Sequence, residues 1–180
     1  MRTIARFATL SLTCFAAVLG APAYAADRAS GTIVCDSTTL EIKHGWLVRG
    51  PNSTYGSMKG LDDLSNPKTM LRVYLASEDV GEALKACKNL SCTKDALGDG
   101  FYIDIGDPAD TPELWYRAWS ADGMSRCSNS LDRPALELTI DKPDHLAGKF
   151  RFEQMGGTQT ADVEFDLELA NTVKTEYQFE

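Results

Sequence analysis

Residues 148–169 constrain the fold more than any other stretch, because they combine a turn signal with strict alternation of apolar and polar side chains. Gly156 and Gly157 stand between two alternating segments, and both central residues of a two-residue type I′ turn need positive φ angles. Pairing outward from this turn places Phe152 opposite Ala161. A slip of one residue would set apolar side chains against charged ones, so the alternation fixes the register. The stretch therefore predicts an antiparallel hairpin with one apolar and one charged face.

The charged face of this hairpin carries four carboxylates at alternate positions: Asp162, Glu164, Asp166 and Glu168. The predicted register sets Arg151 and Lys149 opposite the first two, and His145 opposite Glu168. Residues two apart on a strand are separated by about 7 Å, whereas calcium needs six to eight oxygens within about 2.6 Å. A solvated face with cross-strand ion pairs is therefore favoured over a metal site. Asp166 and Glu168 remain a candidate docking surface for a basic partner.

Short alternating segments recur along the chain and predict further strands. They comprise residues 39–48, 69–76, 101–105, 113–120 and 135–141. Residues 77–87 favour a helix, with Ser77 as its N-cap and two acidic residues in its first turn. Short strands separated by turn signals indicate a mainly β fold. We expect an antiparallel β-sandwich, Ig-like or barrel-like, with at most one short helix.

The amino terminus has the three parts of a secretory signal peptide. Arg2 and Arg6 precede an apolar run over residues 7–20, and the small residues of Ala23-Tyr24-Ala25 form a cleavage site. Cys14 lies inside the apolar run after a threonine, so cleavage after residue 25 is favoured over a lipoprotein anchor. We expect one domain over residues 26–180, periplasmic or secreted, with no membrane span after cleavage.

The predicted mature domain is acidic. The signal peptide holds two of the 18 basic residues and none of the 26 acidic ones, which leaves 16 against 26 and a net charge of −10. A chain of this charge is a poor candidate for binding nucleic acid or an anionic membrane surface.

Four cysteines remain in the predicted mature chain: Cys35, Cys87, Cys92 and Cys127. An even number in an exported protein favours disulfides. Only four residues separate Cys87 from Cys92, so this pair can close a small loop, which leaves Cys35 for Cys127. Zinc is disfavoured because Cys35 and Cys127 form no second close pair.

Two stretches hold candidate binding residues. In "DIGDPAD", the loop carboxylates Asp104, Asp107 and Asp110 are weak calcium candidates, since Asp, Gly and Pro are also ordinary turn residues. In "WYRAW", Trp115, Arg117 and Trp119 share one strand face. Burial of two large indoles favours a core or sheet-covering role, but an exposed face would be the best binding surface in the chain.

Catalytic signals are sparse. The two histidines are His44 and His145, and no nucleophile-elbow, zinc-protease or phosphate-loop motif is present. Strand 39–48 is expected to place His44 on its apolar side. The side chains expected on that side are Leu40, Ile42, His44, Trp46 and Val48. Many carboxylates are available for glycosidase chemistry, but nothing selects a pair across a cleft.

The segments "EIKHGWLVRG", "MLRVYLASEDV" and "HLAGKFRFEQ…ADVEFDLEL" together resemble small uncharacterised exported β-sandwich proteins of Gram-negative bacteria. The resemblance implies a periplasmic location and no particular activity. Our first hypothesis is a non-catalytic binding module without a cofactor, of inhibitor or immunity type, acting on another envelope protein. A calcium- or small-ligand-binding domain is the second, and an envelope hydrolase is the third.

Overall fold

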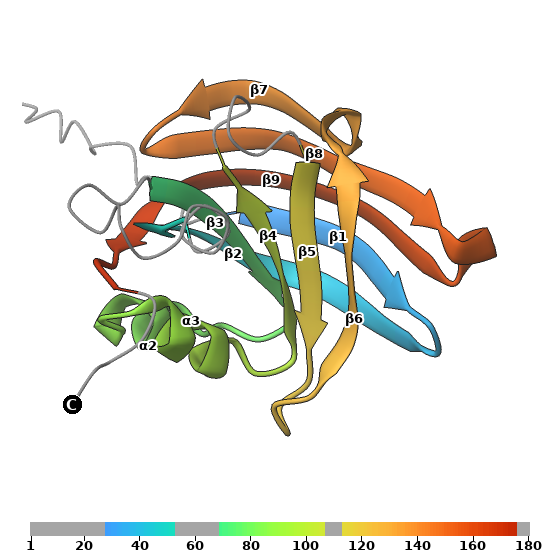
Figure 1. The fold of residues 1–180 in the computed structure, drawn as a ribbon, viewed down its shortest axis with the longest axis horizontal. Coiled ribbons are helices and arrows are strands. Elements are labelled where there is room, and N and C mark those ends of the chain that lie inside the picture. The colour runs from blue at the N-terminus through green and yellow to red at the C-terminus, as the bar shows by residue number, and fades with distance from the viewer. Residues whose placement is uncertain (1–27, 53–68, 107–112, 176–180) are drawn as a thin grey trace, which may run out of the picture.

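The computed structural model describes residues 28–52, 69–106 and 113–175 (Figure 1). The predicted signal peptide, Asp107 and Asp110 lie outside these ranges. The strands are β1 (Arg28–Cys35), β2 (Thr38–Pro51), β3 (Thr69–Ala76), β4 (Gly100–Ile105), β5 (Glu113–Trp119), β6 (Ser125–Asp132), β7 (Leu136–Lys142), β8 (His145–Gln154) and β9 (Gln159–Thr172). The helical elements are α2 (Gly81–Ala86), α3 (Leu90–Leu97) and the 3-10 turns η2 (Arg133–Ala135) and η3 (Met155–Gly157).

All nine of these strands form one sheet, in the order β6-β5-β4-β3-β2-β1-β9-β8-β7. Neighbours in this order run antiparallel, and β2 also pairs with β9 in parallel. In Figure 1, β5 and β6 cross in front of β1 and β2 at a steep angle, so the sheet folds over itself. Its edge strands β6 and β7 follow each other through η2, and no pairing joins them within the described residues. The mainly β fold is confirmed, as an unclosed, barrel-like sandwich.

The inner core fills the space between the two halves of the sheet. Phe101 from β4 packs against Tyr116 from β5 and Phe150 from β8, with ring centroids 5.3 and 5.9 Å apart. All three are essentially excluded from solvent. Aromatic pairs at such separations add to the stabilisation that burial of their area provides.

The outer core lies under α2 and α3, on the opposite face of β2, β3 and β4. Its fully buried members include Tyr74, Leu84 and Leu97. Because inner-core residues such as Val73 and Leu75 alternate with outer-core residues, β3 is buried on both faces. The helices therefore convert one end of the outer sheet surface into a second core and leave β5 and β6 uncovered.

The hairpin of β8 and β9 has the predicted register. Gly156 and Gly157 have φ angles of 66° and 88°, and Phe152 stands opposite Ala161. The apolar side chains predicted to face inward all contribute to the inner core or pack against it: Phe150, Phe152, Val163, Phe165, Leu167 and Leu169. Turn chemistry and alternation therefore define this element from local sequence alone.

Strand β2 departs from its predicted alternation. Leu40 and Ile42 lie in the inner core as expected, but Trp46 and Val48 lie in the outer core, and Leu47 takes the inner position. The expectation that all even-numbered residues share one side is therefore wrong. The pairing between β1 and β2 shifts register beside residues 42–44, and such an irregularity moves the following side chains to the other face.

Three elements escape the sequence prediction: β1, β6 and α3. The expected maximum of one helix is wrong, because α3 follows α2 after three residues. Asn89 caps α3 by accepting a hydrogen bond from the Cys92 backbone N–H at 2.8 Å. The expected Ser77 cap is also wrong, since α2 starts after Val80.

Both predicted disulfides are present. Cys35–Cys127 joins β1 to β6 over a sequence separation of 92, and Cys87–Cys92 joins the end of α2 to α3 over a separation of five. Disulfides persist in oxidising compartments, so the pair indicates that the protein matures in one. Among the described residues, no helix combines the length and the apolar composition that crossing a membrane requires.

Candidate functional site

The two tryptophans of β5 point away from the inner core. Leu114, Tyr116 and Ala118 of the same strand are essentially fully buried, whereas Trp115 exposes 43% of its surface. We call Trp115, Arg117 and Trp119 the tryptophan face. The expectation that both indoles serve as core or sheet cover is therefore wrong for Trp115. Tyr116 and Ala118 between the indoles fill the inner core, Trp119 packs against the edge of the outer core, and Trp115 lies open to solvent.

Two cations flank the Trp119 ring on this face. The Arg117 guanidinium carbon lies 5.4 Å from its centroid, and Lys94 Nζ of α3 lies 4.7 Å from it. Both distances are in the range of cation–π attraction. Arg117 therefore lies over the indole of its strand neighbour Trp119. Sequence reasoning missed Lys94 because it missed α3; the Asn89 cap was the available signal.

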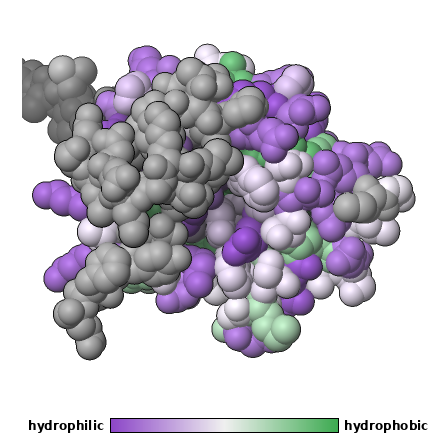
Figure 2. All heavy atoms as spheres, in the orientation of Figure 1, coloured by the Kyte–Doolittle hydropathy of each residue, from purple (hydrophilic) through white to green (hydrophobic). Residues whose placement is uncertain are grey.

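The tryptophan face begins where the helical cover ends. Across the sheet, Tyr74 stands opposite Tyr102, which stands opposite Arg117. The two tyrosines are buried beneath α2 and α3, whereas Arg117 is only half-buried. The helices and strands β4–β6 lie toward the viewer in Figure 1, and Figure 2 shows atoms of intermediate hydropathy over β5 and β6. A row of outer residues therefore passes from a buried core to an open surface.

A buried ion pair lies beside this row, on the same face of the sheet. Arg72 of β3 binds both carboxylate oxygens of Asp104, with Nη2 to Oδ2 at 2.8 Å, and its guanidinium carbon lies 4.1 Å from the Tyr102 ring centroid. Burial is the largest single influence on the pKa of Arg72 and lowers it, but the charge and hydrogen bonds of Asp104, together with Tyr74 and Tyr102, raise this pKa well above its usual value. The Tyr74 hydroxyl contacts Thr93 Oγ1 of α3 at 2.5 Å.

The calcium candidate Asp104 is therefore engaged by Arg72 rather than held open in a loop. Its partners Asp107 and Asp110 lie outside the described residues. Within residues 28–52, 69–106 and 113–175, no cluster of three or more His, Cys, Asp or Glu could hold a metal ion.

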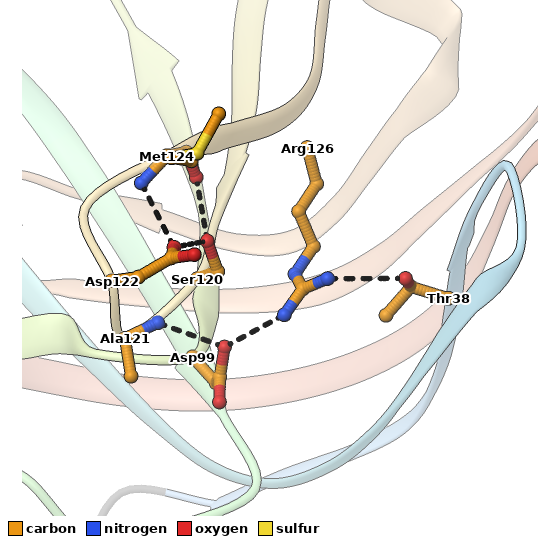
Figure 3. A network of polar contacts seen from close by, with 7 residues as sticks. All are labelled: Thr38, Asp99, Ser120, Ala121, Asp122, Met124 and Arg126. Carbon is orange, nitrogen blue, oxygen red and sulfur yellow. Dashed lines mark hydrogen bonds and ion pairs between the residues drawn. The ribbon is translucent and has the colours of Figure 1, made fainter.

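Polar contacts fix the tip of the β5–β6 hairpin, next to the tryptophan face (Figure 3). Asp99 accepts hydrogen bonds from the Ala121 backbone N–H at 3.0 Å and from Arg126 at 3.3 Å. Arg126 also donates to the Thr38 hydroxyl at 3.3 Å, which links this tip to the β1–β2 hairpin. A hydrogen bond from Ser120 lowers the pKa of Asp122. The network holds β5 and β6 in place without using either indole.

The acidic ladder, defined as Asp162, Glu164, Asp166 and Glu168, is exposed along β9. Arg151 Nε lies 2.6 Å from Asp162 Oδ1, and Lys149 forms an ion pair with Glu164, as predicted. His145 stands opposite Glu168 in the register but places Nε2 2.6 Å from Asp166 Oδ1, on the diagonal. The cations Arg151 and Lys149 therefore offset part of the ladder's charge.

Changing Asp162 to Asn together with Glu164 to Gln should lower the free energy of unfolding by at most about 1–2 kcal/mol, because exposed ion pairs contribute little. Calcium should not change the melting temperature of either protein. Thermal melts with calcium and with a chelator test this expectation. A calcium-dependent stabilisation of the wild type that the double variant lacks would show that the ladder binds metal.

The two histidines have different surroundings. His44 stacks on Trp46 with ring centroids 5.9 Å apart. His145 makes its ring contact with Asp166, and no hydroxyl is hydrogen-bonded to either imidazole among the described residues. A nucleophile activated by a histidine needs such a contact, so the described geometry offers no reason to favour hydrolysis.

Comparison with known proteins identifies no relative: no protein-family model, no curated protein and no solved structure matches this chain. The tryptophan face is the candidate functional site on the strength of its own geometry.

Proposed function

We propose that the protein is an exported, non-catalytic binding module that acts in the periplasm and recognises a protein partner through the tryptophan face. An inhibitor or immunity type of role fits a module of this kind. The partner would be another protein of the cell envelope.

The exposure of Trp115 carries this proposal. Leaving a tryptophan side chain in water forgoes the free energy that its burial would provide. In β5 the buried side chains are Leu114, Tyr116 and Ala118, and Trp115 remains exposed. Trp and Arg are also the residues most enriched where truncation weakens protein–protein binding. Strand β5 presents a tryptophan and an arginine on its solvent-facing side, and this is the composition found at the centre of protein–protein interfaces.

The charge of the face indicates the partner's chemistry. Arg117 and Lys94 bring two cations to an indole on a chain whose formal net charge is −8. A partner surface with carboxylates around an apolar recess would complement them. The acidic ladder, including Asp166 and Glu168, is a less favoured docking surface, because Asp166 already has His145 as a partner.

Changing Trp115 and Arg117 together to Ala should weaken partner binding at least thirtyfold, about 2 kcal/mol or more, while leaving the fold intact. Partners would be captured from periplasmic extract, identified by mass spectrometry, purified and titrated by calorimetry. The matched control is Met124→Ala with Arg151→Ala, which removes one exposed apolar residue from the neighbouring hairpin tip and one arginine from β8 but leaves the tryptophan face itself intact.

Equal affinity of the purified partner for the wild type and the Trp115/Arg117 variant would refute the tryptophan face as the docking site. Loss of binding on changing Asp166 to Asn and Glu168 to Gln, with the tryptophan variant unaffected, would assign the partner to the acidic ladder instead.

A further inference from the structure

A cavity of about 550 Å³ lies between β7 and the neighbouring ends of β3, β4 and β5. It opens on the inner side of the folded sheet, whereas the tryptophan face is on the outer side. Its volume falls in the range of about 300–1,000 Å³ that small-molecule sites occupy.

The cavity wall is an accessible part of the inner core. Leu71, Ile105, Leu136 and Leu138 line it, pack against the inner core and remain only partly buried. Leu114, which is fully buried, also contributes to the lining. An apolar ligand in this space would remove the exposed part of these side chains from water, which is favourable in proportion to the area covered.

Cations surround the cavity. Among the described residues, Arg49, Arg133 and Lys142 line it together with one acid, Asp141, in a chain of formal net charge −8. Arg49 donates a hydrogen bond to the Pro143 carbonyl, and Arg133 donates one to the Gly106 carbonyl at 2.6 Å. The acceptor of Arg49 is neutral, so this contact orients its guanidinium group without cancelling its charge. A guanidinium group held in this way suits a carboxylate or phosphate.

We propose that this cavity binds an anionic amphiphile, with the apolar body against the leucines and a carboxylate or phosphate head between Arg49 and Lys142. The site goes beyond the proposed protein-binding function and does not depend on it. The apolar wall selects for a chain or ring system, and the excess of cations selects for the charge of the head.

Calorimetric titration of the purified protein with decanoate, decyl phosphate and decyltrimethylammonium, each below its micelle concentration, tests the proposal. The two anions should bind saturably at one site, and the cation should bind at least about tenfold more weakly. Tighter binding of decanoate would indicate a fatty acid as the natural ligand, and tighter binding of decyl phosphate would indicate a phosphorylated lipid. Acetate and inorganic phosphate, which lack the chain, should show no saturation.

Changing Arg49 and Lys142 together to Gln should weaken binding of the preferred anion about tenfold or more. The matched control, Arg151→Gln with Lys149→Gln, removes the same two residue types from β8, where they pair with the acidic ladder, and should change affinity less than about threefold. Lys142→Gln alone should weaken binding in the same direction if the double variant folds poorly. Leu138→Trp, which fills the cavity, should abolish binding.

Absence of saturable binding by both anions, equal binding of the cation, or equal loss in the control variant would each overturn the proposal. The Trp115→Ala, Arg117→Ala variant should retain the wild-type affinity for the amphiphile. Failure of the amphiphile site is therefore distinguishable from failure of the tryptophan face.

Discussion

Changing Cys35 and Cys127 together to Ala should lower the free energy of unfolding by up to about 4–5 kcal/mol. The bridge closes a loop of 92 residues, and in the chain-entropy model stabilisation grows with the logarithm of loop length. Both cysteines are buried in the inner core, so the substitution also removes some packing. Denaturant unfolding of the two oxidised proteins measures the difference.

The matched control is the same substitution at Cys87 and Cys92. That bridge closes a loop of five residues, so its loss should cost only about 2 kcal/mol. Equal losses in the two variants would contradict loop length as the source of the difference. A loss below about 1 kcal/mol for Cys35 and Cys127 would mean that the unfolded chain is not restricted by the longer bridge.

Changing Asp104 to Ala should cost about 3–5 kcal/mol, because it leaves the buried guanidinium of Arg72 without its carboxylate. Arg72 sits between the Tyr102 ring and the Tyr74 hydroxyl, which is 3.4 Å from Nη1, and neither group carries a compensating charge at neutral pH. The free energy of unfolding from denaturant titration reports this loss.

The double variant Arg72→Met, Asp104→Ala provides the control for the uncompensated charge. It removes both charges and should be more stable than Asp104→Ala alone, since a buried ion pair replaced by apolar groups is often neutral in stability. If the double variant loses as much as the sum of the two single variants, the pair does not act through its charge.

The β8–β9 hairpin was predictable because its signals are local. Gly156 and Gly157 set the turn, and each strand alternates without interruption, so one register alone satisfies both. The disulfides were predictable for a similar reason, since the short spacing of Cys87 and Cys92 left one partner each for Cys35 and Cys127.

Strands β1 and β6 were not predictable because what defines them lies in other parts of the chain. In β1, Gly31 has a φ of 139°, and a Cβ atom there would lie 2.1 Å from the carbonyl oxygen of Asp162 on β9. In β6, the inward-facing Asn129 finds its hydrogen-bond partner in a remote part of the sequence, because its side-chain amide donates to Gln154 of β8 at 3.2 Å. Composition counts glycine and asparagine against a strand, and tertiary contacts outweigh that preference.

The candidate site was identified in part. The alternation of "WYRAW" correctly grouped Trp115, Arg117 and Trp119, but alternation alone does not tell which face of a strand is the inner one. That choice depends on where α2 and α3 stop covering the sheet, and α3 itself went unrecognised. The cavity was beyond sequence reasoning because its lining comes from five strands and a turn brought together only by the fold.

The change of faces within β2 divides the protein into two compartments of evolutionary constraint. Trp46 and Leu47 are neighbours in the chain but belong to different cores. A substitution at Trp46 must therefore be compatible with packing beneath the helices, and one at Leu47 with packing in the inner core. Residues of the helical layer could therefore drift, and with them the edge of the tryptophan face, while the interior that shapes the cavity stays as it is. Such a division would let one surface acquire new partners without altering the other site.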